Sequence, residues 1–133
     1  MAIADTNAVI GAYLLTCTTL TNLVGIRIMS PRLYKNCVLP AAGFFERSGT
    51  ANPHIPGILI SSVQFDCWAD NSLAARNVYN KLYDALQGIQ NITVGSYQIM
   101  SAIEEVQGQD LVDVEVPNYF RTLCFFSIMI RAE

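Results

Sequence analysis

The segment VQFDCWADNSLAARNVYNKLYDALQG, residues 63–88, holds a strand and a helix in direct succession. In the first seven positions Val63, Phe65 and Cys67 share one face, and Gln64, Asp66 and Trp68 share the other. This alternation is the two-residue period of a strand. Asp70-Asn71-Ser72 is a cluster of helix N-cap residues. The helix that follows runs to Gln87 and ends at Gly88, with an apolar stripe made of Ala75, Val78, Leu82, Ala85 and Leu86.

Outward from this unit, the pattern predicts one more helix and further strands. Apolar residues recur at three- and four-residue spacing from Asp5 or Thr6 onward, and Gly25 offers a stop, so one helix is expected there. Ser48–Pro56 has the composition of a loop. Five strands are expected: Ile26–Met29, Val38–Arg47, Gly57–Trp68, Tyr97–Glu104 and Tyr119–Arg131. The order predicts a single α+β domain over residues 1–133, a mostly antiparallel sheet with two main helices packed on it as a sandwich.

The last of these strands is apolar on both faces. Leu123, Phe125 and Met129 alternate with a second apolar set, which consists of Cys124, Phe126, Ile128 and Ile130. Such a pattern is typical of a central strand that is covered on both sides.

The composition points to buried contact surface. Apolar residues make up 52% of the 133 residues and charged residues 14%, where a soluble domain has about 25% charged residues. Burial against other subunits and contact with a membrane are the two interpretations, and the first is favoured because large apolar patches usually mark contact surfaces. The uncharged run Thr6–Ile26 is long enough to span a bilayer, but polar residues are spread through it and no basic region precedes it. We therefore expect no export signal and no membrane span.

No pattern in the sequence predicts catalysis, a cofactor or a metal site. His54 is the only histidine and lies in a loop-like Asn-Pro-His-Ile-Pro setting. Cys17, Cys37, Cys67 and Cys124 are far apart and form no C-x-x-C pair, so reduced thiols in a cytoplasm are expected. No phosphate-binding or nucleophile motif is present, and the net charge of −3 gives no general attraction to nucleic acid.

Charged residues gather in two segments of opposite sign. The acids Glu104, Glu105, Asp110, Asp113 and Glu115 have no basic residue between them. Acid–base chemistry or binding of a hard cation is conceivable there, but the spacing matches no calcium loop, and a solvated acidic hairpin or loop is the favoured interpretation. Half of the eight basic residues lie near the first two strands, namely Arg27, Arg32, Lys35 and Arg47. This asymmetry suits head-to-tail contacts between copies.

Trp68 lies on the strand face opposite Phe65. Packing in the core is the default interpretation, and an anchor at an interface is the alternative, because tryptophan is enriched at binding hot spots.

Several segments together resemble one family. Val24-Gly25-Ile26-Arg27-Ile28 and Leu39-Pro40-Ala41-Ala42 are similar to the opening of the tail terminator, or tail-completion, family of long-tailed (siphovirus-like) bacteriophages. The strand–helix unit resembles the family's V-Q-[VF]-D-x-W-A strand and the helix after it. Asp110-Leu111-Val112-Asp113 and Tyr119-Phe120-Arg121-Thr122-Leu123 resemble its D-L-Y-D loop and closing strand, although Val112 replaces the usual aromatic residue.

The resemblance implies a non-enzymatic virion protein at the head–tail junction, assembled in the host cytoplasm. It implies a ring of six copies that caps the head-proximal end of the tail tube, stops polymerisation of the tube and joins it to the head connector. A neck adaptor or stopper is the nearest variant, and a small ligand-binding or enzymatic domain is the alternative class. In this reading Arg27, Arg32, Lys35, Arg47, Trp68, Asp110 and Asp113 are candidate contacts with subunits or tube. Glu104, Glu105 and Glu115 are candidate channel acids past which DNA moves without specific binding.

Overall fold

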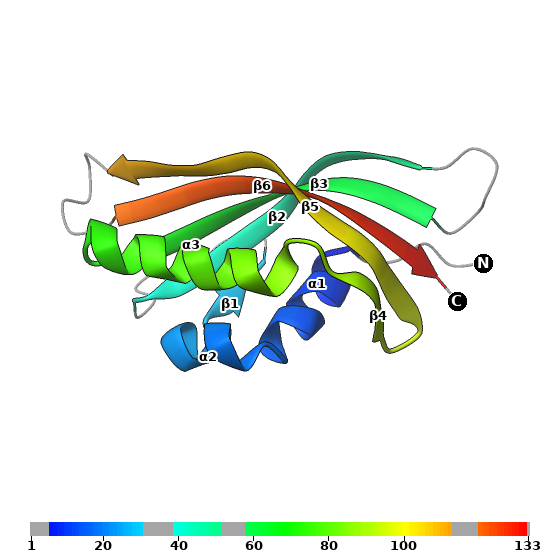
Figure 1. Ribbon diagram of the computed structural model, residues 1–133, viewed down its shortest axis with the longest axis horizontal. Coiled ribbons are helices and arrows are strands. Elements are labelled where there is room, and N and C mark those ends of the chain that lie inside the picture. Colours follow the sequence, from blue (N-terminus) through cyan, green and yellow to red (C-terminus); the bar gives the residue numbers. More distant parts are fainter. Residues whose placement is uncertain (1–5, 31–38, 52–57, 113–119, 133) are drawn as a thin grey trace.

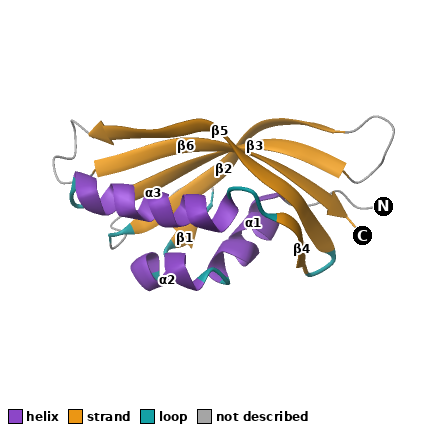
Figure 2. Cartoon of the chain, viewed as in Figure 1, coloured by secondary structure: helices purple, strands orange, loops and turns teal. Residues whose placement is uncertain are grey.

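The computed structural model of the chain describes residues 6–30, 39–51, 58–112 and 120–132. Three helices lie together on one side of a curled sheet (Figures 1 and 2). The helices are α1 (Thr6–Leu15), α2 (Thr18–Val24) and α3 (Ser72–Leu86). The strands are β1 (Ile28–Met29), β2 (Ala41–Ala51), β3 (Ile58–Ala69), β4 (Gln90–Val94), β5 (Tyr97–Val112) and β6 (Phe120–Ala132). The α+β class predicted from the sequence is confirmed.

The six strands form one sheet in the order β1-β2-β3-β6-β5-β4. All neighbouring pairs are antiparallel except β1 and β2, which are parallel. β6 pairs with β3 along its whole length and with β5 on its other side, so the prediction that the last strand is central is confirmed. In the described part of the chain, helices cover only one face of this strand. Its other face, with Leu123, Phe125 and Met129, is half-buried.

The core lies between the sheet and the helices. Phe65 is fully buried in it, and its ring lies 5.6 Å from the rings of both Phe44 and Phe126. Val78 and Leu82 of α3 belong to the same cluster, so Phe65 lies in the core together with the apolar stripe of this helix. The Tyr13 hydroxyl donates a hydrogen bond to the carbonyl of Ala85 at 2.6 Å, which joins α1 to α3.

The single N-terminal helix expected from the pattern is instead two helices. They meet at Thr16 and Cys17 with a bend of 89°. The Thr16 hydroxyl donates to the carbonyl of Tyr13 at 2.6 Å, a local bond that competes with continuation of the helix. No single described helix is long and apolar enough to cross a membrane; α1 and α2 reach that length and composition only as this bent pair.

Two strand boundaries and one whole strand also differ from the prediction. β2 continues to Ala51, into the segment expected to be a loop, because residues 48–51 pair with β3. β4 was missed altogether; it forms a hairpin with β5 around Gly95, which has a φ of 58°. β5 was expected to end at Glu104 and extends to Val112, so Glu105 and Asp110 also lie on this strand, which pairs antiparallel with β6; the hairpin alternative for the acidic segment fits this better than a loop. The remainder of the loop 52–56, with His54, lies outside the described residues, as does Cys37.

Candidate assembly surfaces

The sheet face turned away from the helices carries three of the six candidate residues that the structure describes, namely Arg47, Trp68 and Glu105. We call it the open face. In the register of β3 with β6, Gln64 is opposite Phe125, Asp66 opposite Leu123, and Trp68 opposite Arg121. All six are partly exposed, whereas their neighbours along β3 are buried against the helices. Aromatic residues and arginine are enriched in protein contact surfaces, so Trp68, Phe125 and Arg121 favour such a role for this face.

The charges on the open face are paired and stacked within the chain. The Arg47 guanidinium lies 4.2 Å from the centre of the Phe125 ring and donates to the Ser62 hydroxyl at 3.3 Å. That hydroxyl donates to Glu105 at 2.7 Å. The structure thus brings one residue of the basic segment and one of the acidic segment onto a single face, where they balance each other.

A second charged group on the open face is centred on Asp66. Its carboxylate is only 13% exposed, and the nearest guanidinium nitrogen of Arg121 is 3.7 Å away. The Gln64 amide donates to it over 3.4–3.5 Å. Burial raises the pKa of Asp66 above its ordinary value of 3.8, and the nearby Arg121 and Gln64 offset only part of this rise. Arg121 also lies 5.1 Å from the centre of the Trp68 ring, and Trp68 lies on the open face, not in the core.

The raised pKa makes the charge of Asp66 a cost to the folded chain. The Asp66 carboxyl group binds a proton more readily in the folded than in the unfolded state. Its contribution to the free energy of unfolding is therefore greatest below pH 3.8 and falls as the pH rises through the folded-state pKa. We expect Asp66→Asn, which resembles the protonated form, to melt at a higher temperature than the wild type at pH 7. The difference should shrink towards pH 3. Thermal unfolding at several pH values measures it; a variant that is less stable at pH 7 contradicts this account.

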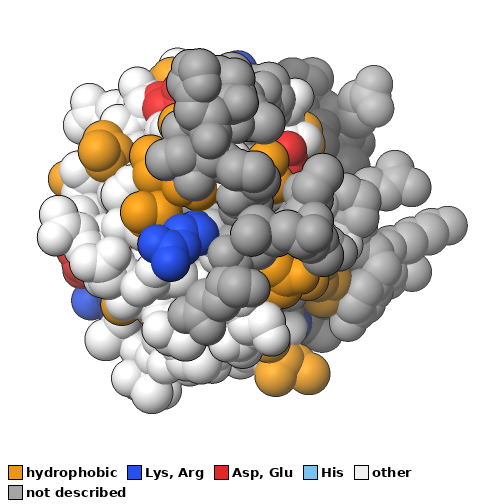
Figure 3. Space-filling model, turned by 90° about the vertical axis from the view of Figure 1, so that its right-hand side faces the viewer, with side chains coloured by type: hydrophobic (Ala, Val, Ile, Leu, Met, Phe, Trp, Pro, Cys, Tyr) orange, Lys and Arg blue, Asp and Glu red, His pale blue; other side chains and the backbone are white. Residues whose placement is uncertain are grey.

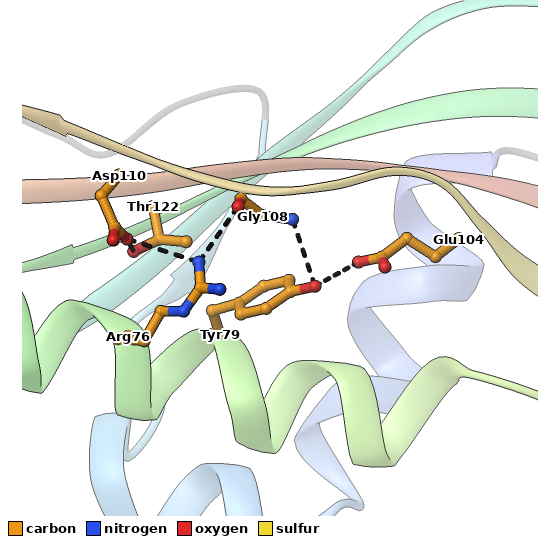
Figure 4. A network of polar contacts seen from close by, with 6 residues as sticks. All are labelled: Arg76, Tyr79, Glu104, Gly108, Asp110 and Thr122. Atoms are coloured by element: carbon orange, nitrogen blue, oxygen red, sulfur yellow. Dashed lines mark hydrogen bonds and ion pairs between the residues drawn. The ribbon is translucent and has the colours of Figure 1, made fainter.

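A polar network fastens β5 to α3 on the other face (Figure 4). The Tyr79 hydroxyl donates to Glu104 at 2.5 Å and accepts a bond from the Gly108 amide at 3.2 Å. Burial, reinforced by the Glu104 carboxylate, raises the pKa of Tyr79 to about 12, so its hydroxyl keeps its proton. Glu104 was expected to be exposed with the other acids. This expectation is wrong, because the register of β5 turns Glu104 towards α3.

The same network holds Asp110. Arg76 of α3 donates to the carbonyl of Gly108 at 3.0 Å and lies 3.4 Å from Asp110, which also accepts a bond from the buried Thr122 hydroxyl at 3.1 Å. Asp110 is still half-exposed, at 54% of its side chain. If Asp110 also contacts another subunit, its carboxylate must bind that partner in addition to Arg76 of α3 and Thr122 of β6.

The remaining candidates are dispersed. Arg27 donates from Nε to the carbonyl of Pro40 at 2.9 Å, and its own carbonyl accepts from Ala42. It therefore joins β1 to β2. The other four candidates, Arg32, Lys35, Asp113 and Glu115, lie outside the described residues.

Sequence reasoning missed two kinds of residue. Arg121 and Phe125 alternate with buried residues of β6 as clearly as Gln64 and Asp66 do on β3, but two apolar faces were taken as evidence of complete cover. Arg76 and Tyr79 were missed because only the long-range pairing of β5 brings them to Gly108.

The thiols that the structure describes are poorly suited to chemistry. Cys67 and Cys124 are buried on neighbouring strands, and burial raises the pKa of both thiols, which leaves little thiolate at neutral pH. The Cys17 thiol donates to the carbonyl of Tyr13. In the described ranges no three His, Cys, Asp or Glu side chains come together in a way that could hold a metal ion.

Exposed hydrophobic side chains also occur elsewhere on the described surface. Figure 3 shows the end of the molecule at the right of Figure 1, where hydrophobic side chains gather next to a basic group. The exposed large hydrophobic residues of the chain include Ile26 at 84%, Leu73 at 75% and Ile103 at 57% exposure. These side chains are spread over α3, β5 and the segment between α2 and β1.

Comparison with known proteins yields a likeness of fold. No protein-family model matches the sequence, and no curated protein does. The structure is similar to a chain of the virion of a native gene transfer agent (GTA) particle, with a TM-score of 0.73. The match covers 95% of this chain and 94% of that chain, at 13% sequence identity. At this identity the likeness shows that the two chains share one fold from end to end.

Proposed function

We propose that this chain is a structural virion protein that caps the head-proximal end of a phage tail tube as a ring. The observation that carries the proposal is the end-to-end fold match to a chain of a phage-like virion particle. A match over nearly all of both chains means that this fold, without an added domain, serves as a virion component in the other particle. The family resemblance of the V-Q-F-D-C-W-A strand and its helix then favours the terminator role.

The open face and the low charge of the chain support a role in assembly. A sheet face with Trp68, Leu123 and Phe125 half-exposed, in a chain with 14% charged residues, is suited to burial against other subunits. Interfaces of this kind commonly bury about 1,200–2,000 Å². The proposed partners are further copies of the chain in a ring of six, the tail tube protein and the head–tail connector. The protein assembles in the host cytoplasm and resides at the head–tail junction, without catalysis or a cofactor.

The acidic residues retain a proposed role in the channel, with one change. Glu105 is exposed and, with Glu115, is a candidate to repel the phosphates of passing DNA. Glu104 has a structural partner in Tyr79 and is not proposed for this role. A neck adaptor or stopper at the same junction is the second candidate function, because a virion fold match does not by itself distinguish the two positions.

The test is whether the purified protein limits tail tubes. We expect it to co-sediment with tubes assembled from tail tube protein and, when added during assembly, to stop their growth at one end. Electron microscopy of tube ends and of tube lengths measures both effects. Binding to isolated connectors but not to tubes would favour the adaptor role. A protein that binds neither and stays monomeric in their presence contradicts an assembly function.

A further inference from the structure

One carboxylate on the open face is poorly satisfied by its own chain. Asp66 is 13% exposed, yet its ion pair with Arg121 is long, at 3.7 Å, and its contacts with Gln64 are at the limit of hydrogen bonding. Its cross-strand neighbour on β6 is Leu123, so apolar surface lies beside it. A carboxylate held in such surroundings gains most from a further donor supplied at close range.

The outward side of α3 offers a matching donor. Lys81 is exposed there, and in the part of the chain that the structure describes no acidic side chain forms an ion pair with it. Asp84 follows one turn later on the same side, and Leu73, 75% exposed, lies two turns earlier. This side of the helix therefore presents a cation, an anion and an apolar residue.

We propose that α3 of one copy docks by this outward side on the open face of the next copy, with Lys81 donating to Asp66. The charges of the two surfaces are complementary, because the open face presents Asp66 beside Arg121 and the helix presents Lys81 beside Asp84. This match identifies a second copy of the chain as the partner of the open face. The inference rests on the proposed function, in which copies of the chain form a ring. The helix and the open face lie on opposite sides of the molecule, so the contact is head-to-tail, the kind that closes into a ring when the rotation permits.

A double-mutant cycle tests the contact. Asp66→Asn and Lys81→Gln remove one charge each with little change in side-chain size. The proteins to compare are the wild type, the two single variants and the double variant. Sedimentation velocity over a range of concentrations gives the association constant. We expect each single substitution to weaken self-association by about tenfold, since close interfacial charge pairs commonly couple by at least this factor. The double variant should be weakened no more than either single variant.

The stability of the monomer supplies an internal control. Asp66 and Lys81 are on opposite sides of one chain, so their effects on unfolding at low protein concentration should add, while their effects on association do not. The same unfolding measurements show whether Asp66→Asn is folded, so that weaker association of a folded variant does not reflect misfolding. Glu105→Gln is the matched variant on the same face; its carboxylate already accepts from Ser62, and association should change less than threefold.

The outcomes separate this inference from the proposed function. Self-association with additive effects of Asp66→Asn and Lys81→Gln overturns the assigned contact and leaves the ring in place. Coupling of the two residues in unfolding also overturns it, since that would place them in contact within one chain. A wild type that neither self-associates nor binds tubes overturns both. Coupling that appears only in association supports the contact.

Discussion

Phe65→Ala is expected to lower the free energy of unfolding by about 3–5 kcal/mol, the usual cost of removing a fully buried phenylalanine. Its ring is 0% exposed and meets the rings of Phe44 and Phe126 at 5.6 Å from centre to centre. Alanine would leave a cavity beneath α3, and a domain of this size has only about 5–15 kcal/mol of stability in total. Urea unfolding followed by circular dichroism measures the loss.

Phe125→Ala is the matched control for this prediction. Phe125 is directly across the ladder from Gln64, on the open face, where the side chain is only partly buried. The monomer should lose clearly less stability than with Phe65→Ala, while self-association should suffer more. Equal losses of stability at the two positions would mean that the open face is covered within the single chain, against the structure described above.

The strand–helix unit was predictable because its signals are local. The strand was expected to end at Trp68 and ends at Ala69, and the helix was expected to run to Gln87 and runs from Ser72 to Leu86. The capping cluster acts as the composition indicated: the Asn71 side chain accepts a bond from the Ala74 amide at 2.8 Å. Alternation, a cap and an apolar stripe are all encoded within a few residues of the elements they specify.

The errors, apart from β4, fall where distant parts of the chain decide the structure. β4 is short, with the β-branched residues Ile92, Thr93 and Val94; this local strand signal was overlooked, and pairing with β5 holds the strand in the sheet. The far half of β5 passes through two irregularities of register near Val106 that no local pattern predicts. The α1–α2 break was hidden because apolar residues continue through it, and both helices bury them, at Leu14 and at Leu20.

The candidate contact residues were predictable by type but not by arrangement. Trp68 was correctly assigned to the face opposite Phe65, because alternation along a strand fixes that property. That Arg47 and Glu105 come together through Ser62 was not predictable, since they lie on two strands separated by β3 and β6. Separate charged segments of a sequence therefore do not imply separate charged regions of the molecule.

Gly108 is the position where the α3–β5 network leaves no room for a side chain. A Cβ atom there would lie 2.8–2.9 Å from three atoms of the Tyr79 ring, closer than real Cβ contacts occur. The ring cannot move aside cheaply, because it is 5% exposed and its hydroxyl bonds both Glu104 and the Gly108 amide. We expect Gly108→Ala to destabilise the fold by about 1–3 kcal/mol, the usual cost of overpacking.

Two companion variants make this cause specific. In Tyr79→Leu the ring is gone, so adding Gly108→Ala to it should cost much less than in the wild type, a coupling measurable as non-additive free energies of unfolding. Gly11→Ala in α1 is the control, because its Cβ would lie an ordinary 3.5 Å from the nearest atom of Phe44. Alanine in a helix interior is favoured over glycine by about 0.5–1 kcal/mol, so this variant should be neutral or more stable. Additive losses at Gly108 and Tyr79 would show that strand geometry, and not the ring, requires the glycine.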